Sequence, residues 1–291
     1  MKWLGTLVKY SISVMLLVGL VFAGGIISVL LYGKMSNKPW ADSFSVFAFA
    51  EGCRIEGRLE EPVQTEGPVL SEPDEDEAEP KETPEPLPPS AMLDAPAISQ
   101  FPELRSGCEV TSLTMLLQYY GINKDKLELA EEMKKDPTPL QVDKQNNIVY
   151  WGNPNLGFVG DVTGKRKGFG IYHTALYELL EAYVPTAVDL TGSDFETLER
   201  QVAKGIPVVV WTTVRMEVPA ESQWVVWDTP IGPIKTTFQE HAVLLVGYDE
   251  DHVYVNDPWT GEAKVKVNKA QFIETYEALG KQALSYELEE G

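Results

Sequence analysis

One of the two cysteines, Cys108, has the sequence surroundings of a nucleophile. Ser106 and Gly107 come directly before it and indicate a helix entry, and apolar residues recur after it at helical spacing (Val110, Leu113, Leu116, Leu117, Tyr120). The thiol is therefore predicted on the first turn of a helix, where unpaired N–H groups and the helix dipole favour a thiolate. An unpaired cysteine can also be a small core residue. The helix start and the pair described next favour the nucleophile.

Of the three histidines, His241 has a carboxylate predicted beside it. It begins the apolar run 241–248, which predicts a buried strand, and 252–257 predicts the returning strand, stopped by a proline. With a turn near position 249, His241 and Asp257 lie opposite each other on one face. Asp257 could then orient the imidazole while the other ring nitrogen faces the thiol. Taken singly, His241 could be a core histidine and Asp257 a turn residue, but their pairing favours catalysis.

The other two histidines are weaker candidates for a base. His252 lies an odd number of strand positions from Asp257, so it is predicted on the opposite face, exposed to solvent. His173 opens another expected helix, and no acidic residue is evidently placed to orient it. The chemistry indicated is acyl transfer without a metal or other cofactor, because no Cys/His cluster has zinc spacing.

Several sequence blocks around these residues resemble a known family. The blocks GCEVTSL, WGNPNLGFVGD, HAVLLVGYD and VYVNDPW, with Gln100 upstream of the cysteine, resemble cysteine peptidase family thirty-nine, and more narrowly its stand-alone extracytoplasmic branch in Gram-positive bacteria. The resemblance covers roughly residues 96 to 289. It implies a papain-like fold with Cys108 as nucleophile and His241 as general base and acid. It also implies that Asp257 orients the histidine and that Gln100 is an oxyanion-hole donor, although Gln100 could be an ordinary polar loop residue.

The better-known relatives cleave double-glycine leaders from bacteriocin precursors and are fused to export transporters. This sequence contains no transporter-like membrane domain and no Gly-x-x-x-x-Gly-Lys-Ser/Thr segment, so leader processing is not expected to carry over. The leading expectation is a cysteine peptidase that hydrolyses peptide bonds through a thioester. The alternatives are an amidase or transpeptidase acting on cell-wall peptides with the same triad, and a non-catalytic peptide-binding module. The complete Cys/His/Asp set argues against the binding module.

The N-terminal region predicts a membrane anchor. Residues 11–33 carry no charge and are long enough to cross a hydrocarbon core of about 30 Å, which exceeds the usual apolar region of a secretory signal. We expect 1–10 to be a cytoplasmic tail, 11–33 a single-pass signal anchor, and the catalytic domain to lie outside the cell. If the segment is cleaved, the protein would be secreted.

Residues 34–95 are predicted to form a disordered stalk rich in acidic residues and proline. The part from 51 to 95 contains fourteen acidic residues, three basic residues and eight prolines. Such a segment has too little apolar surface to offset the conformational entropy that it would lose on ordering. Cys53 lies in this stalk as an unpaired thiol. The net charge of −20 argues against nucleic acid as a partner, leaving a peptide or protein substrate and the membrane.

The remaining segment, 96–291, suits one catalytic domain of α+β class. The nucleophile helix is expected to pack across a mainly antiparallel sheet, and loops at 151–155 and 165–170 could line a substrate cleft. Helices are predicted at 108–120, 124–134, 172–183, 193–204 and 268–279, and strands at 207–213, 223–228, 241–248, 252–257 and 263–267.

Overall fold

The computed structural model describes residues 86–288 of the chain. The predicted tail, the membrane segment, most of the stalk and Cys53 lie outside the described residues. Within 86–288, no helix combines the length and the apolar character that crossing a bilayer requires.

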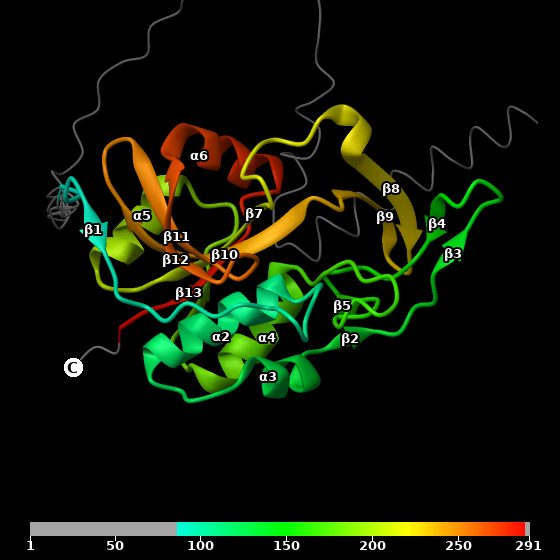
Figure 1. Ribbon diagram of the computed structural model, residues 1–291, viewed down its shortest axis with the longest axis horizontal. Coiled ribbons are helices and arrows are strands. Elements are labelled where there is room, and N and C mark those ends of the chain that lie inside the picture. The colour runs from blue at the N-terminus through cyan, green and yellow to red at the C-terminus, as the bar shows by residue number, and fades with distance from the viewer. Residues whose placement is uncertain (1–85, 289–291) are drawn as a thin grey trace, which may run out of the picture. The chain divides into compact units, whose positions relative to one another are not determined.

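The elements follow one another along the chain as short strands, helices and a final run of longer strands (Figure 1). They are β1 (Ala91–Met92), α2 (Cys108–Tyr120), α3 (Lys126–Glu132), β2 (Lys135–Asp136), β3 (Gln141–Val142), β4 (Ile148–Tyr150), β5 (Phe158–Val159), α4 (His173–Tyr183), β6 (Ala187–Asp189), α5 (Phe195–Ala203), β7 (Val208–Thr213), η2 (Glu221–Gln223), β8 (Trp224–Thr229), β9 (Gly232–Thr237), β10 (Glu240–Tyr248), β11 (His252–Asp257), β12 (Glu262–Asn268), α6 (Lys269–Ala278) and β13 (Ala283–Tyr286).

The main sheet has seven strands, and all of its pairings are antiparallel. Six strands run in the order β12-β11-β10-β7-β13-β6, and β1 pairs with the end of β10. Strand β10 lies between β7 and β11, and all nine of its residues are buried. Its run of branched apolar residues fits a strand covered on both faces, because no side needs a polar surface.

Helices cover both faces of this sheet (Figure 1). Helix α2 packs on β10 and β7 from one side, with α3 and α4 beside it. Helices α5 and α6 contact the sheet from the other side. The core is therefore layered as helix, sheet and helix, and the nucleophile helix lies across the central strand, as the sequence predicts.

The chain segment that connects β7 to β10 contributes two strands to a second sheet. Strands β8 and β9 form an antiparallel hairpin, and β8 also pairs with β4, which pairs with β3. Strand β9 leads through a short turn directly into β10. Residues 237–239, at the end of this hairpin, therefore lie directly before the strand that carries His241.

The prediction of a mixed helix and sheet fold is confirmed. All five predicted helices and all five predicted strands are present, with ends shifted by a few residues. Helix α3, predicted from 124, begins at Lys126 because Asp125 and Glu128 form a reciprocal capping box. Strands such as β6, β9 and β13 were not predicted, because they are short or mix polar and apolar residues without a clear period.

Candidate active site

Cys108 is the first residue of α2. Gly107 precedes it as the N-cap and offers no side-chain cap, so the first N–H groups of the helix remain free to face the site. A Cβ at position 107 would lie 2.8 Å from Leu104 Cβ, which explains why the chain has glycine there. Ser112 Oγ on the same helix donates to the Ala242 carbonyl over 3.0 Å, tying the nucleophile helix to the residue after His241.

His241 and Asp257 form a buried pair, with 2.7 Å between His241 Nε2 and Asp257 Oδ1. Their side chains are 1% and 7% exposed. The two residues are cross-strand neighbours on one face, as predicted, although their pairing is diagonal: Leu244 pairs with Asn256, so Asp257 falls next to Val243. The turn lies at 249–251 as expected, and parity keeps both side chains on one face even though β10 carries a bulge between Leu245 and Gly247.

Asp257 is held by more than the histidine. The Trp259 N–H donates to Oδ1 over 2.8 Å, and the Thr260 hydroxyl donates to Oδ2 over 3.4 Å. Burial alone would raise the pKa of Asp257, but the hydrogen bond and charge of His241 outweigh it, so the pKa is lowered. An ionised carboxylate can only accept, so Nε2 carries a proton and Nδ1 is the nitrogen free to accept one.

Gln100 is buried close to this hairpin. Its backbone N–H donates to the Pro258 carbonyl over 2.8 Å, and its side-chain Nε2 donates to the Arg105 carbonyl over 2.9 Å. The backbone and the side-chain amide of Gln100 are thus each held by one hydrogen bond, and Nε2 has a second N–H. The oxyanion role of Gln100 stays a prediction, and its buried Oε1 has no hydrogen-bond partner.

A pocket of about 350 Å³ brings three of the four predicted site residues together. Asp257 lies behind His241 rather than in the wall. Gly168 and Phe169, from one of the two loops expected to line a cleft, are part of the wall, whereas 151–155 are not. The lining residues are Gln100, Arg105, Ser106, Cys108, Gly168, Phe169, Val214, Thr237, Phe238, Gln239, Glu240, His241 and Trp259.

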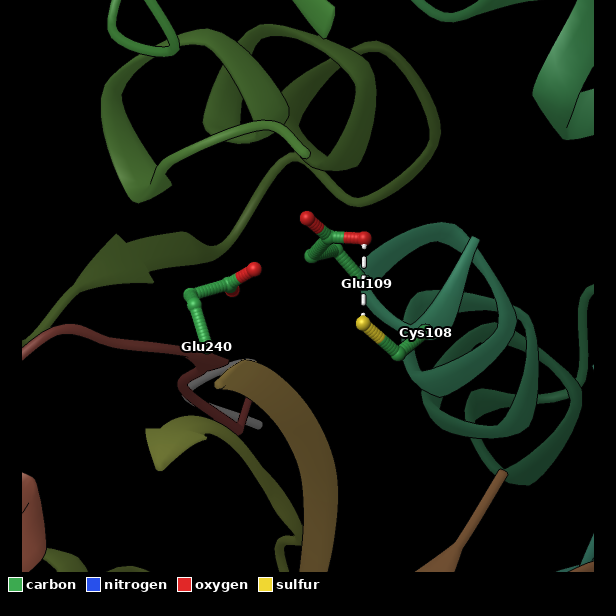
Figure 2. A group of neighbouring side chains, drawn as sticks. All are labelled: Cys108, Glu109 and Glu240. Carbon is green, nitrogen blue, oxygen red and sulfur yellow. Dashed lines mark hydrogen bonds between the residues drawn. The ribbon is translucent and has the colours of Figure 1, made fainter. Parts of the chain in front are cut away.

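Two glutamates that the sequence reasoning missed lie beside the thiol (Figure 2). The Cys108 thiol donates to Glu109 Oε2 over 3.3 Å, and an oxygen of Glu240 lies within 4.8 Å of both groups. Glu109 is fully buried and Glu240 is 7% exposed. Glu109 directly follows Cys108, and Glu240 directly precedes His241. A charged residue at the start of an apolar helix or strand is the sequence signal that could have identified them.

These carboxylates reverse one expectation. Burial raises the pKa of the Cys108 thiol well above its usual value, and negative charge on Glu109 or Glu240 raises it further. The position at a helix start is as predicted, but the predicted ease of ionisation is wrong for this arrangement, in which the thiol is bonded to a glutamate. The helix dipole is the weaker influence because burial opposes ionisation and any charge on the glutamates lies much closer.

The remaining histidines lie away from the pocket wall. His173 does have an acidic partner, contrary to expectation: its Nδ1 lies 2.7 Å from Asp189 Oδ2, at the end of β6. That strand was not predicted, so the contact could not be anticipated. His252 is half-buried rather than exposed, and its ring bonds Asp249 Oδ1 over 3.1 Å. Only His241 combines a carboxylate partner with a place in the cysteine pocket.

Comparison with known proteins places this chain in a family of peptidase-like proteins. The sequence pattern of the Peptidase_C39 like family matches residues 92–284, a range that spans the described fold and all four candidate residues. The chain therefore belongs to this family. The resemblance drawn from the sequence blocks is confirmed at the level of the family.

Individual relatives agree with this assignment. The chain is 38% identical over 184 residues to the uncharacterized protein YvpB of Bacillus subtilis (strain 168), covering 63% of this chain and 70% of that protein. A crystal structure of a putative C39-like peptidase from Bacillus anthracis superposes with a TM-score of 0.63 at 40% identity, covering 69% of this chain and 99% of that one. Xylellain, a cysteine protease from Xylella fastidiosa, gives a TM-score of 0.35 at 14% identity, too low to support an argument.

Proposed function

We propose that this protein is a cysteine peptidase that hydrolyses peptide bonds through Cys108, His241 and Asp257. The observation that carries the proposal is the buried His241–Asp257 pair, whose histidine shares a pocket with a cysteine at the start of a helix. A nucleophile helix packed on an antiparallel sheet, with the base on a strand, is the arrangement expected of a papain-like enzyme. Membership of the family supports the same chemistry.

In the proposed acylation step, the thiol proton passes to His241 Nδ1, since Nε2 is occupied by Asp257. The thiolate attacks the carbonyl carbon, and a C–S bond forms while the carbonyl electrons move to oxygen. The Cys108 N–H and a Gln100 N–H would stabilise that oxyanion. His241 then gives its proton to the leaving amine as the C–N bond breaks, and a thioester remains.

In the deacylation step, His241 takes a proton from water, and the resulting hydroxide attacks the thioester. The C–S bond breaks, the acid product leaves, and the histidine returns the proton to the thiolate. Each group ends in its starting state, so the triad supplies the full cycle. The pocket volume and its aromatic wall, with Phe169, Phe238 and Trp259, suit one or two residues of a peptide chain.

We also propose that 11–33 anchor the protein in the cell membrane with the catalytic domain outside. The length of the uncharged segment and the acidic, proline-rich stretch after it support this proposal. Protease added to intact cells without an outer wall should release a fragment that begins within 51–95. Release only after the membrane is permeabilised would place the domain in the cytoplasm.

The decisive experiment for the activity profiles the full chain against a peptide library and purified cell-wall fragments. We expect cleavage of peptide bonds that is lost in His241→Ala and kept in His173→Ala, a control at a histidine that also pairs with an aspartate. Cleavage confined to cell-wall cross-links would indicate the amidase or transpeptidase instead. Binding without turnover would identify a non-catalytic module.

A further inference from the structure

The two glutamates beside Cys108 lie close to each other as well as to the thiol. Glu109 extends from α2 and Glu240 from the start of β10, and their carboxylates meet near the thiol (Figure 2). Within residues 86–288, neither carboxylate forms an ion pair with a basic side chain. Burying two adjacent carboxylates that are both ionised is very costly, so at least one of them must hold a proton.

Hydrogen bonds fix which oxygen of Glu109 faces the thiol. The Ile171 N–H donates to Oε1 over 2.8 Å, leaving Oε2 directed at Cys108 Sγ over 3.3 Å. A Cβ at Gly170 would lie 2.2 Å from Glu109 Oε1 and 3.0 Å from Glu240 Oε2, so the backbone there packs against both carboxylates. Glu109 is therefore held with one oxygen as an acceptor and the other on the sulfur.

The surroundings favour protonated carboxyl groups in the range where a peptidase works. Burial raises the pKa of Glu109 to about 7, and burial together with the charge of Glu109 raises the pKa of Glu240 well above its usual value. The other titratable side chains that face the pair are Cys108, Tyr172 and, across the pocket, His241. Glu240 Oε1 is buried and has no hydrogen-bond partner among the described residues, so nothing there stabilises an ionised form of this carboxyl group.

We propose that Glu109 is a further catalytic residue: the Glu109–Glu240 pair holds a proton, and Glu109, as a carboxylic acid, donates a hydrogen bond from Oε2 to the Cys108 thiolate. This inference rests on the proposed function, because it assigns a role at the same nucleophile. In the resting state the thiol donates to Oε2. When the thiol proton passes to His241 Nδ1, the carboxyl proton of Glu109 stays on Oε2 and turns toward the sulfur. An ionised Glu109 would instead repel the thiolate.

The test is the pH dependence of Cys108 alkylation by iodoacetamide, followed by mass spectrometry in the full chain carrying Cys53→Ser. Glu109→Gln supplies a neutral N–H donor of nearly the same shape at every pH and keeps an oxygen for Ile171. Because one neutral donor replaces another, we expect its alkylation midpoint to stay near that of the parent. Glu109→Leu, which has no donor, should raise the midpoint, and Glu131→Gln, an exposed glutamate on α3, should leave it unchanged.

A midpoint lowered in both Glu109→Gln and Glu109→Leu would overturn the proposal, because it would mean that Glu109 is ionised beside the thiol and repels the thiolate. If either variant does not fold, Glu240→Gln provides the second measurement: it should lower the midpoint, since Glu240 carries the charge of the pair when Glu109 holds the proton. Alkylation needs no substrate. A midpoint raised in Glu109→Leu and kept in Glu109→Gln, without any peptide hydrolysis by the parent, would therefore refute the proposed peptidase function while supporting the role of Glu109 toward the thiol.

Discussion

Replacing Asp257 separates the charge of the orienting residue from its hydrogen bonds. In Asp257→Asn the retained Oδ1 can still accept from His241 Nε2 and from the Trp259 N–H, while the new NH₂ group faces the Thr260 hydroxyl. Only the negative charge is lost. In Asp257→Ala both the charge and the acceptor are lost, and the Trp259 N–H loses its partner as well.

The size of each effect follows from the bond at 2.7 Å. A hydrogen bond to a charged group contributes about 1.5–3 kcal/mol and a neutral one about 0.5–1.5 kcal/mol. Losing the charge should therefore cost about 1–1.5 kcal/mol, or roughly 5- to 12-fold in the rate of Cys108 alkylation and of peptide cleavage. Asp257→Ala should cost roughly 10- to 150-fold.

The assay is the second-order rate constant of Cys108 alkylation together with the melting temperature of each variant. Asp189→Asn is the matched control, since Asp189 bonds His173 at the same 2.7 Å but lies away from the pocket wall. It should leave the rate unchanged. If Asp257→Asn is as slow as Asp257→Ala while both melt like the parent, the charge alone matters and the orienting argument fails. Equal alkylation rates in the parent, Asp257→Asn and Asp257→Ala would show that Asp257 is not part of the triad.

The remaining predictions concern the nucleophile, the base, the oxyanion donor and the buried acid. Cys108→Ala should abolish peptide turnover while Cys53→Ala keeps it, and similar losses would contradict a single nucleophile. His241→Ala should be as damaging as loss of the cysteine, measured as kcat/KM. Gln100→Ala should lower kcat about 10²- to 10³-fold, and a change in KM alone would argue against an oxyanion role. Glu109 has its pKa raised from 4.5 to about 7, so the folded state keeps a proton that the unfolded chain loses. Relative to Glu109→Gln, the parent should therefore lose stability as pH rises from about 4.5 to about 7, by on the order of 3 kcal/mol in denaturant unfolding, and a gain would contradict the buried acid.

The sequence was sufficient for the elements that carry long, periodic apolar patterns. Helix α2 and strands β10 and β11 were placed within a residue, because their apolar positions repeat at 3.6 or fill a buried strand. Parity alone predicts His241 and Asp257 on one face, and the structure places them there in a diagonal pairing. The contact forms because a diagonal neighbour is still within reach of an imidazole.

The sequence was insufficient where contacts depend on distant segments. Asp189 reaches His173 through a three-residue strand that has no detectable period. Glu109 and Glu240 are far apart in the chain, and no local pattern shows that α2 and β10 bring them together beneath one thiol. The expected ease of Cys108 ionisation fails for the same reason, since the helix dipole is a local property, whereas the burial of the thiol and the approach of Glu240 depend on distant segments.

The burial of β10 also bears on how the site behaves over time. His241 lies in the second position of a strand whose nine residues are all buried, paired with β7 at Thr212 and covered by helices on both faces. Backbone amides in such a strand exchange with solvent only when the whole domain opens. Among residues 86–288, the backbone amides around His241 should therefore exchange among the slowest. Heat should inactivate the protein when it unfolds and not earlier, and a substrate must fit a site that is already assembled.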